Sequence, residues 1–259
     1  MSLPATILRG SGAVAVFLLH GVGGGKEAWV DNLDAIASAG CRAIAWDAPG
    51  YGESAPLSPL DNAALAHALV ALVDNVDAPV SVLCGHSMGG MIAQEVVARY
   101  PGRVQGLILS ATSPAFGKPG GDWQREFLAS RFAPLDAGIG MAGLAPDLAR
   151  GMLAPGTSDA VVARAAAIMA RVSESTYRAA LAAIVSFNRL AELPAIDVPT
   201  LCLAGEHDAV APVKVMRRMA EKIPGAEFQV LPGAGHIANM ETPAAFNAAV
   251  IEFLQRRFL

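Results

Sequence analysis

Residues 80–99 place a serine between a strand and a helix, and this stretch constrains the fold more than any other in the sequence. Residues 80–84 form a short apolar run that is long enough for a buried strand. Residues 91–99 have helical character and stop before a Pro-Gly pair. Between the two lies the sequence GHSMG, so we predict a sharp strand-to-helix turn with Ser87 at its tip.

This turn would give Ser87 two chemical advantages. The glycines on either side remove Cβ atoms that would collide with the strand and the helix, so the hydroxyl can project above the sheet. The next backbone N–H, that of Met88, would lie at a helix N-terminus, where it favours a developing negative charge. The pattern alone is a weak signal, and a catalytic interpretation also requires a base, an acid and a second N–H donor.

Length and charge exclude several classes of protein. The chain has 259 residues, 53% of them hydrophobic, and this size predicts one large domain or one domain with an insertion. The net charge of −4, without a basic run, argues against a nucleic-acid partner. No continuous apolar window is long enough for a membrane span, and the first residues lack the pattern of a secretion signal. We therefore expect no membrane partner.

Cysteine usage predicts a reducing environment. Cys41, Cys84 and Cys202 each fall in or beside a predicted strand, which favours buried, reduced thiols and a cytoplasmic location. The cysteines are scattered and no H-x-x-x-H or C-x-x-C pattern occurs, so we expect no metal site. A homo-oligomer is left open.

A strand predicted at residues 13–19 leads directly into a glycine-rich loop. Residues 3–9 precede this strand across a Gly-Ser-Gly turn, which predicts a hairpin of the two strands. The loop, residues 20–25 (HGVGGG), does not complete either common phosphate-binding pattern, since GxxxxGK[ST] is missing and a lysine ends GxGxxG. We interpret it as a loop that brings the N–H of Val22 near that of Met88, so that two donors can hold one oxygen.

Strands and helices alternate along most of the chain, which predicts a mostly parallel, doubly wound α/β sheet. The strands are expected at residues 13–19, 41–46, 80–84, 104–110, 198–204 and 227–231, and the helices between them at 26–38, 61–75, 91–99, 214–223 and 242–258. The alternation stops between residues 113 and 192, where only helices are expected. We therefore predict a core of residues 1–112 and 193–259, with residues 113–192 inserted as a helical lid.

Two further candidates follow the last two predicted strands. Asp208 lies in the loop after residues 198–204, and His236 lies in the loop after residues 227–231. Because open α/β sheets place their sites at the carboxyl ends of the strands, both should lie on the same face as Ser87. The chain order Ser, Asp, His is the one expected when an elbow serine leads a triad. Glu206 is a close competitor for the role of the acid.

Five stretches together resemble the α/β-hydrolase fold superfamily, and the resemblance covers nearly the full length of the chain. They are residues 20–23, 47–54, 85–90, 205–212 and 235–243. Within the superfamily the chain looks most like 3-oxoadipate enol-lactonase and related carboxylesterases. The resemblance implies a triad of Ser87, His236 and Asp208, an oxyanion hole formed by the N–H groups of Val22 and Met88, and no cofactor.

These residues predict a serine hydrolase that cleaves a carboxylic ester or a lactone of a small-molecule substrate through an acyl-enzyme on Ser87. A C–C bond hydrolase of ring-cleavage products would use the same triad. A hydrolase-like ligand receptor would keep the pocket without sustained turnover. Sequence alone leaves these alternatives open.

Other polar residues near the motifs are expected to support the site. His20 should fix the oxyanion loop, and His86 should point away from the nucleophile as a support. Asp47 and Ser54 should organise the loop that follows residues 41–46. We expect one or two large apolar side chains of the lid to line the pocket, among Trp123, Phe127, Phe132, Met141, Met152, Met169, Tyr177 and Phe187.

Charges in the predicted lid nearly cancel. Residues 113–192 contain seven arginines and seven acidic residues, and Lys118 adds one positive charge. Arginines in such number could indicate an anionic substrate, but this balance favours a solvated face for most of them.

Overall fold

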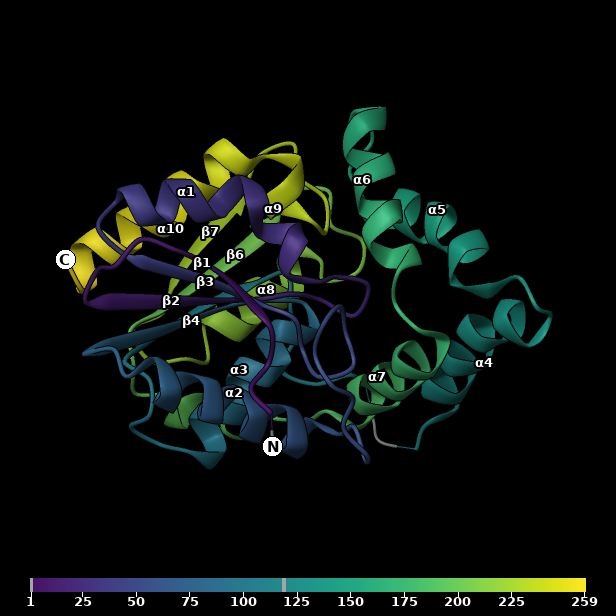
Figure 1. Cartoon of the computed structure of the whole chain (residues 1–259), viewed down its shortest axis with the longest axis horizontal. Coiled ribbons are helices and arrows are strands. Elements are labelled where there is room, and N and C mark those ends of the chain that lie inside the picture. Colours follow the sequence, from purple (N-terminus) through teal and green to yellow (C-terminus); the bar gives the residue numbers. More distant parts are fainter. Residues whose placement is uncertain (1, 118–119) are drawn as a thin grey trace.

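A seven-stranded sheet forms the centre of the protein in the computed structural model, which describes residues 2–117 and 120–259 (Figure 1). The strands are β1 (Thr6–Arg9), β2 (Val14–Leu19), β3 (Arg42–Trp46), β4 (Val80–His86), β5 (Gly106–Ser110), β6 (Thr200–Gly205) and β7 (Glu227–Leu231). Their spatial order is β1-β3-β2-β4-β5-β6-β7, and every neighbouring pair is parallel except β1 with β3. The predicted doubly wound α/β architecture is confirmed.

The central strands are buried on both faces, as their apolar sequence requires. In β2 every residue is buried, and alternate side chains enter different hydrophobic clusters. Phe17 packs on one side of the sheet and Leu18 on the other. A strand of this kind needs helices on both faces, because each face would otherwise expose apolar surface to water.

Helices cover both faces of the sheet. The elements are η1 (Lys26–Trp29), α1 (Val30–Ser38), α2 (Asn62–Val76), α3 (Met88–Arg99), α4 (Asp122–Asp136), α5 (Gly140–Met152), α6 (Asp159–Ala170), α7 (Glu174–Ser186), η2 (Leu193–Ala195), α8 (Val213–Ala220), α9 (Ala238–Glu241) and α10 (Pro243–Arg257). Figure 1 shows α1, α9 and α10 on one face and α2 and α3 on the other. Asp61 forms the N-cap of α2, since its side chain accepts a hydrogen bond from the N–H of Ala64.

The predicted hairpin of the first two strands is wrong. Strand β1 pairs antiparallel with β3, while both edges of β2 are taken by the parallel neighbours β3 and β4. The Gly-Ser-Gly segment instead passes across the turn before β3, where a Cβ on Gly12 would lie 1.9 Å from the carbonyl oxygen of Gly40. The glycines therefore allow a close backbone crossing rather than a hairpin turn.

Residues 113–192, the helical insertion, carry α4–α7 between β5 and β6. Figure 1 shows these four helices gathered beyond one end of the sheet. The chain enters and leaves the insertion side by side, since Phe116 donates its N–H to Phe187 and Arg189 donates its N–H to Pro114. The division of the chain into a core and a lid at these boundaries stays a prediction.

The contact between α3 and β2 yields a stability prediction. A Cβ on Gly89 would lie 2.2 Å from the carbonyl oxygen of Leu19, and neither backbone can move without disturbing the centre of the sheet. We expect Gly89→Ala to lower the free energy of unfolding by more than about 2 kcal/mol, measured by urea denaturation. Gly151→Ala is the matched control, because that glycine lies in α5 with open space around it. The control should be neutral or stabilising by up to about 1 kcal/mol. Equal effects of both changes would contradict the packing argument.

Candidate active site

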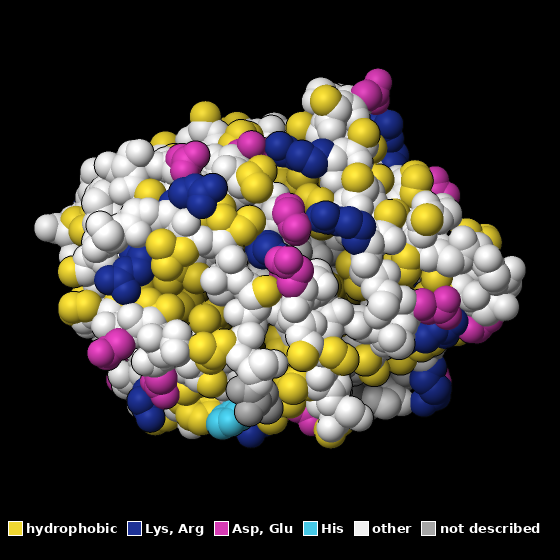
Figure 2. Space-filling model, viewed as in Figure 1, with side chains coloured by type: hydrophobic (Ala, Val, Ile, Leu, Met, Phe, Trp, Pro, Cys, Tyr) yellow, Lys and Arg dark blue, Asp and Glu magenta, His cyan; other side chains and the backbone are white. Residues whose placement is uncertain are grey.

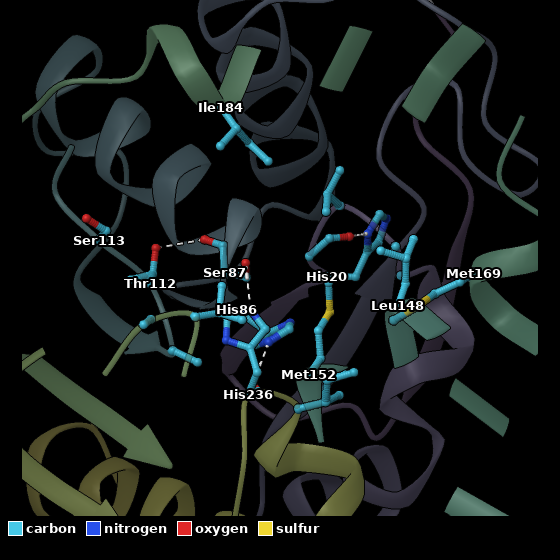
Figure 3. A pocket seen from close by; sticks show the side chains of 18 of the residues that line it. His20, His86, Ser87, Thr112, Ser113, Leu148, Met152, Met169, Ile184 and His236 are labelled. Carbon is cyan, nitrogen blue, oxygen red and sulfur yellow. Dashed lines mark hydrogen bonds between the residues drawn. The ribbon is translucent and has the colours of Figure 1, made fainter. Parts of the chain in front are cut away.

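Ser87 occupies the turn between β4 and α3 in a strained backbone conformation. Its φ of 52° and ψ of −116° lie in a region that non-glycine residues rarely adopt. The N–H of Ser87 donates to Ser110 at 2.9 Å, and the hydroxyl of Thr112 donates to the Ser87 carbonyl at 2.7 Å (Figure 3). The end of β5 thus holds the turn, and the Ser87 hydroxyl is directed into a cavity.

A chain of hydrogen bonds connects three of the predicted residues. Nε2 of His236 lies 3.1 Å from the Ser87 Oγ, and Nδ1 of His236 lies 2.9 Å from an oxygen of Asp208. His236 and Asp208 are almost fully buried. The competing acid, Glu206, is exposed and accepts the N–H of Gly233 instead, so the structure brings Asp208 and not Glu206 to the histidine.

The environment of Asp208 favours its ionised form. Burial by itself raises the pKa of a carboxyl group, but the hydrogen bond from His236 and the N–H donors of Val210 and Ala211 outweigh it, so the pKa of Asp208 is lowered. An ionised Asp208 can only accept, and the proton between the two residues therefore belongs to Nδ1 of His236. Nε2 is then left free to accept the hydroxyl proton of Ser87.

The glycine-rich loop after β2 lies against Ser87. A Cβ on Gly21 would lie 3.1 Å from the Cβ of Ser87. The backbone N–H groups of Val22 and Met88 donate no hydrogen bond to any residue that the structure describes. These two N–H groups are free to bind an oxygen atom near Ser87.

His20 holds this loop, as expected. The N–H of Ala48 donates to Nε2 of His20 at 3.0 Å, so the ring proton is on Nδ1, which donates to the Gly21 carbonyl at 2.8 Å. Burial lowers the pKa of His20 and keeps the ring neutral. The hydroxyl of Tyr51 adds a hydrogen bond to the Val22 carbonyl.

Asp47 ties the segments around the loop together, as expected. Its carboxylate accepts the backbone N–H and the ammonium group of Lys26 at 2.9 and 2.6 Å, and also the N–H of Glu53. The Ser54 hydroxyl donates to the carbonyl of Asp47 at 2.7 Å. The buried ion pair therefore joins the start of η1 to the loop after β3.

His86 supports the backbone of His236. Since a carbonyl can only accept, Nε2 of His86 donates to the His236 carbonyl, at 2.9 Å. The two rings lie 4.9 Å apart, centroid to centroid. Burial, and to a lesser degree the neighbouring His236, lowers the pKa of His86 to about 3. The ring is therefore neutral and acts as a hydrogen-bond donor.

Sequence reasoning assigned no role to Glu241, yet this side chain joins the histidine loop to the helical insertion. One carboxylate oxygen accepts the N–H groups of Gly235 and Ile237, on either side of His236. The other accepts the N–H of Ala154 and the hydroxyl of Thr157, just after α5. A Glu five residues after a candidate base, before Thr-Pro and a helix, was the available signal.

A cavity of about 470 Å³ lies above the serine, between the sheet edge and the helical insertion (Figure 3). The expectation that one or two large side chains of the insertion line it is wrong. Five of the eight candidates do so, namely Trp123, Phe127, Met152, Met169 and Tyr177. Phe132, Met141 and Phe187 are not among the lining residues. The helical period alone could not separate cavity-facing residues from core residues, since both faces of these helices are partly buried.

The structure also bears on the cysteines, on metal binding and on membrane insertion. All three cysteines are buried free thiols, and burial raises the pKa of Cys202 to about 12. Within residues 2–117 and 120–259, no three or more His, Cys, Asp or Glu side chains are grouped so that they could hold a metal ion. Over the same ranges, no helix is long and apolar enough to cross a membrane.

The buried His86 predicts a pH dependence of stability. The unfolded chain binds a proton at this residue near pH 6.5, whereas the folded protein binds one only near pH 3. The unfolded state therefore holds more protons between these values, and stability is lost as the pH falls from 6.5 toward 3. In His86→Gln the unfolded state no longer binds this extra proton. The slope of the unfolding free energy against pH should therefore be smaller by about 1.4 kcal/mol per pH unit. Urea unfolding between pH 4 and 6, within that window, measures the slope. An unchanged slope would contradict a neutral, buried His86.

The sequence of the chain is similar to those of known proteins. Residues 16–249 match the alpha/beta hydrolase family. The 3-oxoadipate enol-lactonase 2 of Acinetobacter baylyi is 30% identical over 219 residues, which are 83% of this chain and 79% of that protein. The chain spans 65% of the length of another relative, the dihydrolipoyllysine-residue acetyltransferase component of the acetoin cleaving system of Pseudomonas putida, with 31% identity.

Solved structures agree with the sequence comparison. An esterase from Thermogutta terrifontis is 28% identical with a TM-score of 0.87, and the match covers 97% of this chain and 93% of that one. The enol-lactonase from Burkholderia xenovorans LB400 is 26% identical with a TM-score of 0.84, covering 97% and 96%. The protein described here therefore belongs to the alpha/beta hydrolase family.

Proposed function

We propose that the protein is a serine hydrolase that cleaves a carboxylic ester or lactone through an acyl-enzyme on Ser87. The observation that carries this proposal is the hydrogen-bonded series from Ser87 through His236 to Asp208, which opens on a mostly apolar cavity. Similarity to an enol-lactonase and an esterase favours the same chemistry. The reaction needs no cofactor.

In the first half of the reaction, Ser87 Oγ attacks the substrate carbonyl while Nε2 of His236 takes the hydroxyl proton. Asp208 stays ionised, keeps the proton of His236 on Nδ1 and stabilises the imidazolium that forms. The imidazolium then gives its proton to the leaving alkoxide, which departs as an alcohol. In a lactone, the alcohol remains attached to the acyl group.

The tetrahedral intermediate carries a negative oxygen, which the N–H groups of Val22 and Met88 would hold. Both groups lack another partner within the described chain, so neither has to break an existing bond to bind the oxyanion. In the second half, His236 activates a water molecule that attacks the acyl-enzyme and releases the acid. We infer that residues 113–192 act as a lid that limits access of bulk water to the cavity formed with residues 1–112 and 193–259.

The proposal also covers the location of the protein and its binding partners. The three buried free thiols favour a reducing compartment such as the cytoplasm. The partner is a small-molecule ester or lactone, and neither nucleic acid nor a membrane is needed. On the face shown in Figure 2, acidic and basic side chains lie next to each other rather than in separate patches.

The decisive experiment compares the wild type with Ser87→Ala on p-nitrophenyl esters, simple lactones and a ring-cleavage dione. We expect the wild type to turn over an ester or a lactone and Ser87→Ala to lose about 10⁴-fold or more, because the nucleophile is gone. Preference for the dione would favour a C–C hydrolase. Labelling of Ser87 in one turnover without sustained product release would favour a ligand receptor. Full activity of Ser87→Ala would disprove the mechanism.

Glu241 should act as a positioning residue for His236. In Glu241→Gln the amide NH₂ faces two backbone or hydroxyl donors, so the loop that carries His236 loses part of its support. We expect kcat for an ester to fall about tenfold with little change in KM, because misplacement of a base affects the transition state more than binding. Glu206→Gln is the matched control, since Glu206 also accepts a backbone N–H but lies exposed outside the cavity. An equal or larger effect of Glu206→Gln would contradict the positioning role of Glu241.

A further inference from the structure

Three aromatic side chains of the helical insertion contact one another at the wall of the cavity. Phe116 lies in the segment that enters the insertion, and Trp123 and Phe127 lie one turn apart on α4. The ring centroid of Phe116 is 5.0 Å from that of Trp123 and 4.9 Å from that of Phe127, and the latter two are 5.9 Å apart. All three line the cavity that contains Ser87. We call these three residues the aromatic cluster.

The aromatic cluster is only partly buried. Trp123 is 56% exposed, although Phe116 and Phe127 pack against its indole. By contrast, Phe187 of the same insertion does not line the cavity and is 1% exposed. An aromatic side chain that only packs the insertion is expected to be enclosed in this way, because removal of its surface from water is what stabilises the fold. The uncovered surface of Trp123 is therefore open to a ligand where the cavity meets the solvent.

Hydrogen bonds hold the backbone of the aromatic cluster in place. The N–H of Phe116 donates to the carbonyl of Phe187 at 3.1 Å, and the carbonyl of Phe116 accepts the side-chain amide of Gln124 at 2.8 Å. Gln124 is buried and is the neighbour of Trp123 on α4. The rings are thus arranged before a ligand arrives, and binding does not have to order them.

A continuous stretch of chain leads from the candidate nucleophile to the aromatic cluster. The hydroxyl of Thr112 donates to the carbonyl of Ser87, and Thr112, Ser113, Ala115 and Phe116 all line the cavity. Four residues of chain span at most about 14 Å, so Phe116 lies within that distance of Thr112. A small molecule can therefore react at Ser87 and contact the aromatic cluster at the same time.

Charge argues against a cationic ligand at the aromatic cluster. The guanidinium carbon of Arg131 lies 5.4 Å from the ring centroid of Phe127. This ring already interacts with one cation, and the charge of Arg131 would repel a second one. An ammonium group is therefore disfavoured as the occupant.

Ring geometry favours an aromatic ligand over an aliphatic one. Aromatic rings gain from offset-stacked and edge-to-face contacts beyond the area that they bury. The aromatic cluster contains both arrangements, with 27° between the planes of Trp123 and Phe127 and 62° between those of Phe116 and Phe127. A fourth ring can extend this arrangement, whereas an alkyl group gains from buried area alone.

We propose that the aromatic cluster is a stacking site for a ring of the substrate, so that the protein prefers an ester or lactone that carries an aryl group away from the reacting carbonyl. Trp123 supplies the exposed face for this ring, and Phe116 and Phe127 fix the position of the indole. Trp123 is then a specificity-determining residue. This inference rests on the proposed hydrolase function, which places the reacting carbonyl at Ser87.

The test uses pairs of methyl esters whose acyl chain ends in a phenyl or a cyclohexyl group. One, three or five methylene groups separate this ring from the carbonyl. At one spacer length we expect the wild type to have a kcat/KM for the phenyl ester about two- to tenfold above that for the cyclohexyl ester, since stacking adds this much beyond burial. Trp123→Leu keeps an apolar side chain without an aromatic face, and should bring the ratio to about one.

Controls separate recognition from a general loss of activity. Trp123→Phe should keep part of the preference, because an aromatic face remains. Ile139→Ala is the matched control, since Ile139 is 54% exposed on the same insertion but is not among the lining residues. This change should leave the ratio unaltered. A wild type without preference at any spacer length, or a Trp123→Leu variant that lowers kcat/KM for both esters by the same factor, overturns the stacking site.

Binding at the aromatic cluster can be measured without turnover. The sequence contains three tryptophans, and Trp29 and Trp46 are completely buried, so iodide quenching of the Ser87→Ala variant reports on Trp123. We expect the phenyl ester to protect this indole from iodide at a lower concentration than the cyclohexyl ester does. The Ser87→Ala, Trp123→Phe double variant is the control and should lose the iodide-sensitive part of the emission.

The quenching experiment distinguishes failure of the stacking site from failure of the proposed function. If no ester is turned over, the hydrolase proposal fails, and preferential protection of Trp123 by the phenyl ester still supports the stacking site. Equal protection by both esters, or protection by neither, overturns it. Protection that grows with protein concentration in the absence of ester also overturns it, since a second copy of the chain would then cover Trp123.

Discussion

The backbone conformation of Ser87 is the constraint on which the candidate site depends. A serine at φ 52° costs about 1–3 kcal/mol, so neighbouring elements must hold it. Strand β5 does so through Ser110 and Thr112, and the first turn of α3 does so through the N–H groups of Gly90 and Met91, which donate to the Ser87 carbonyl. The strain is therefore offset by the packing of a strand and a helix. The hydroxyl position is a property of the sheet rather than of a mobile loop.

The histidine loop depends on the helical insertion as well as on the sheet. The N–H of His236 donates to the carbonyl of Met152 at 2.8 Å, and Glu241 bonds both the histidine loop and the segment after α5. A displacement of α5 away from the sheet would break the three bonds that cross to it and the segment after it, which are those from His236 to Met152 and from Ala154 and Thr157 to Glu241. Three hydrogen bonds thus join the insertion to the loop that carries the proposed base, and two more hold Glu241 against the backbone on either side of His236.

The positions of the three candidate catalytic residues could be predicted from the sequence, because each depends on a short stretch of chain. A glycine-flanked serine, buried strands and loops at their carboxyl ends placed Ser87, Asp208 and His236 on one face. The predicted pairing of β1 with β2 was wrong because both edges of β2 are occupied by β3 and β4. The short turn between β1 and β2 carries no information about these more distant neighbours. The bonds of Glu241 could not be read from sequence, since its donors at positions 154 and 157 lie more than eighty residues away.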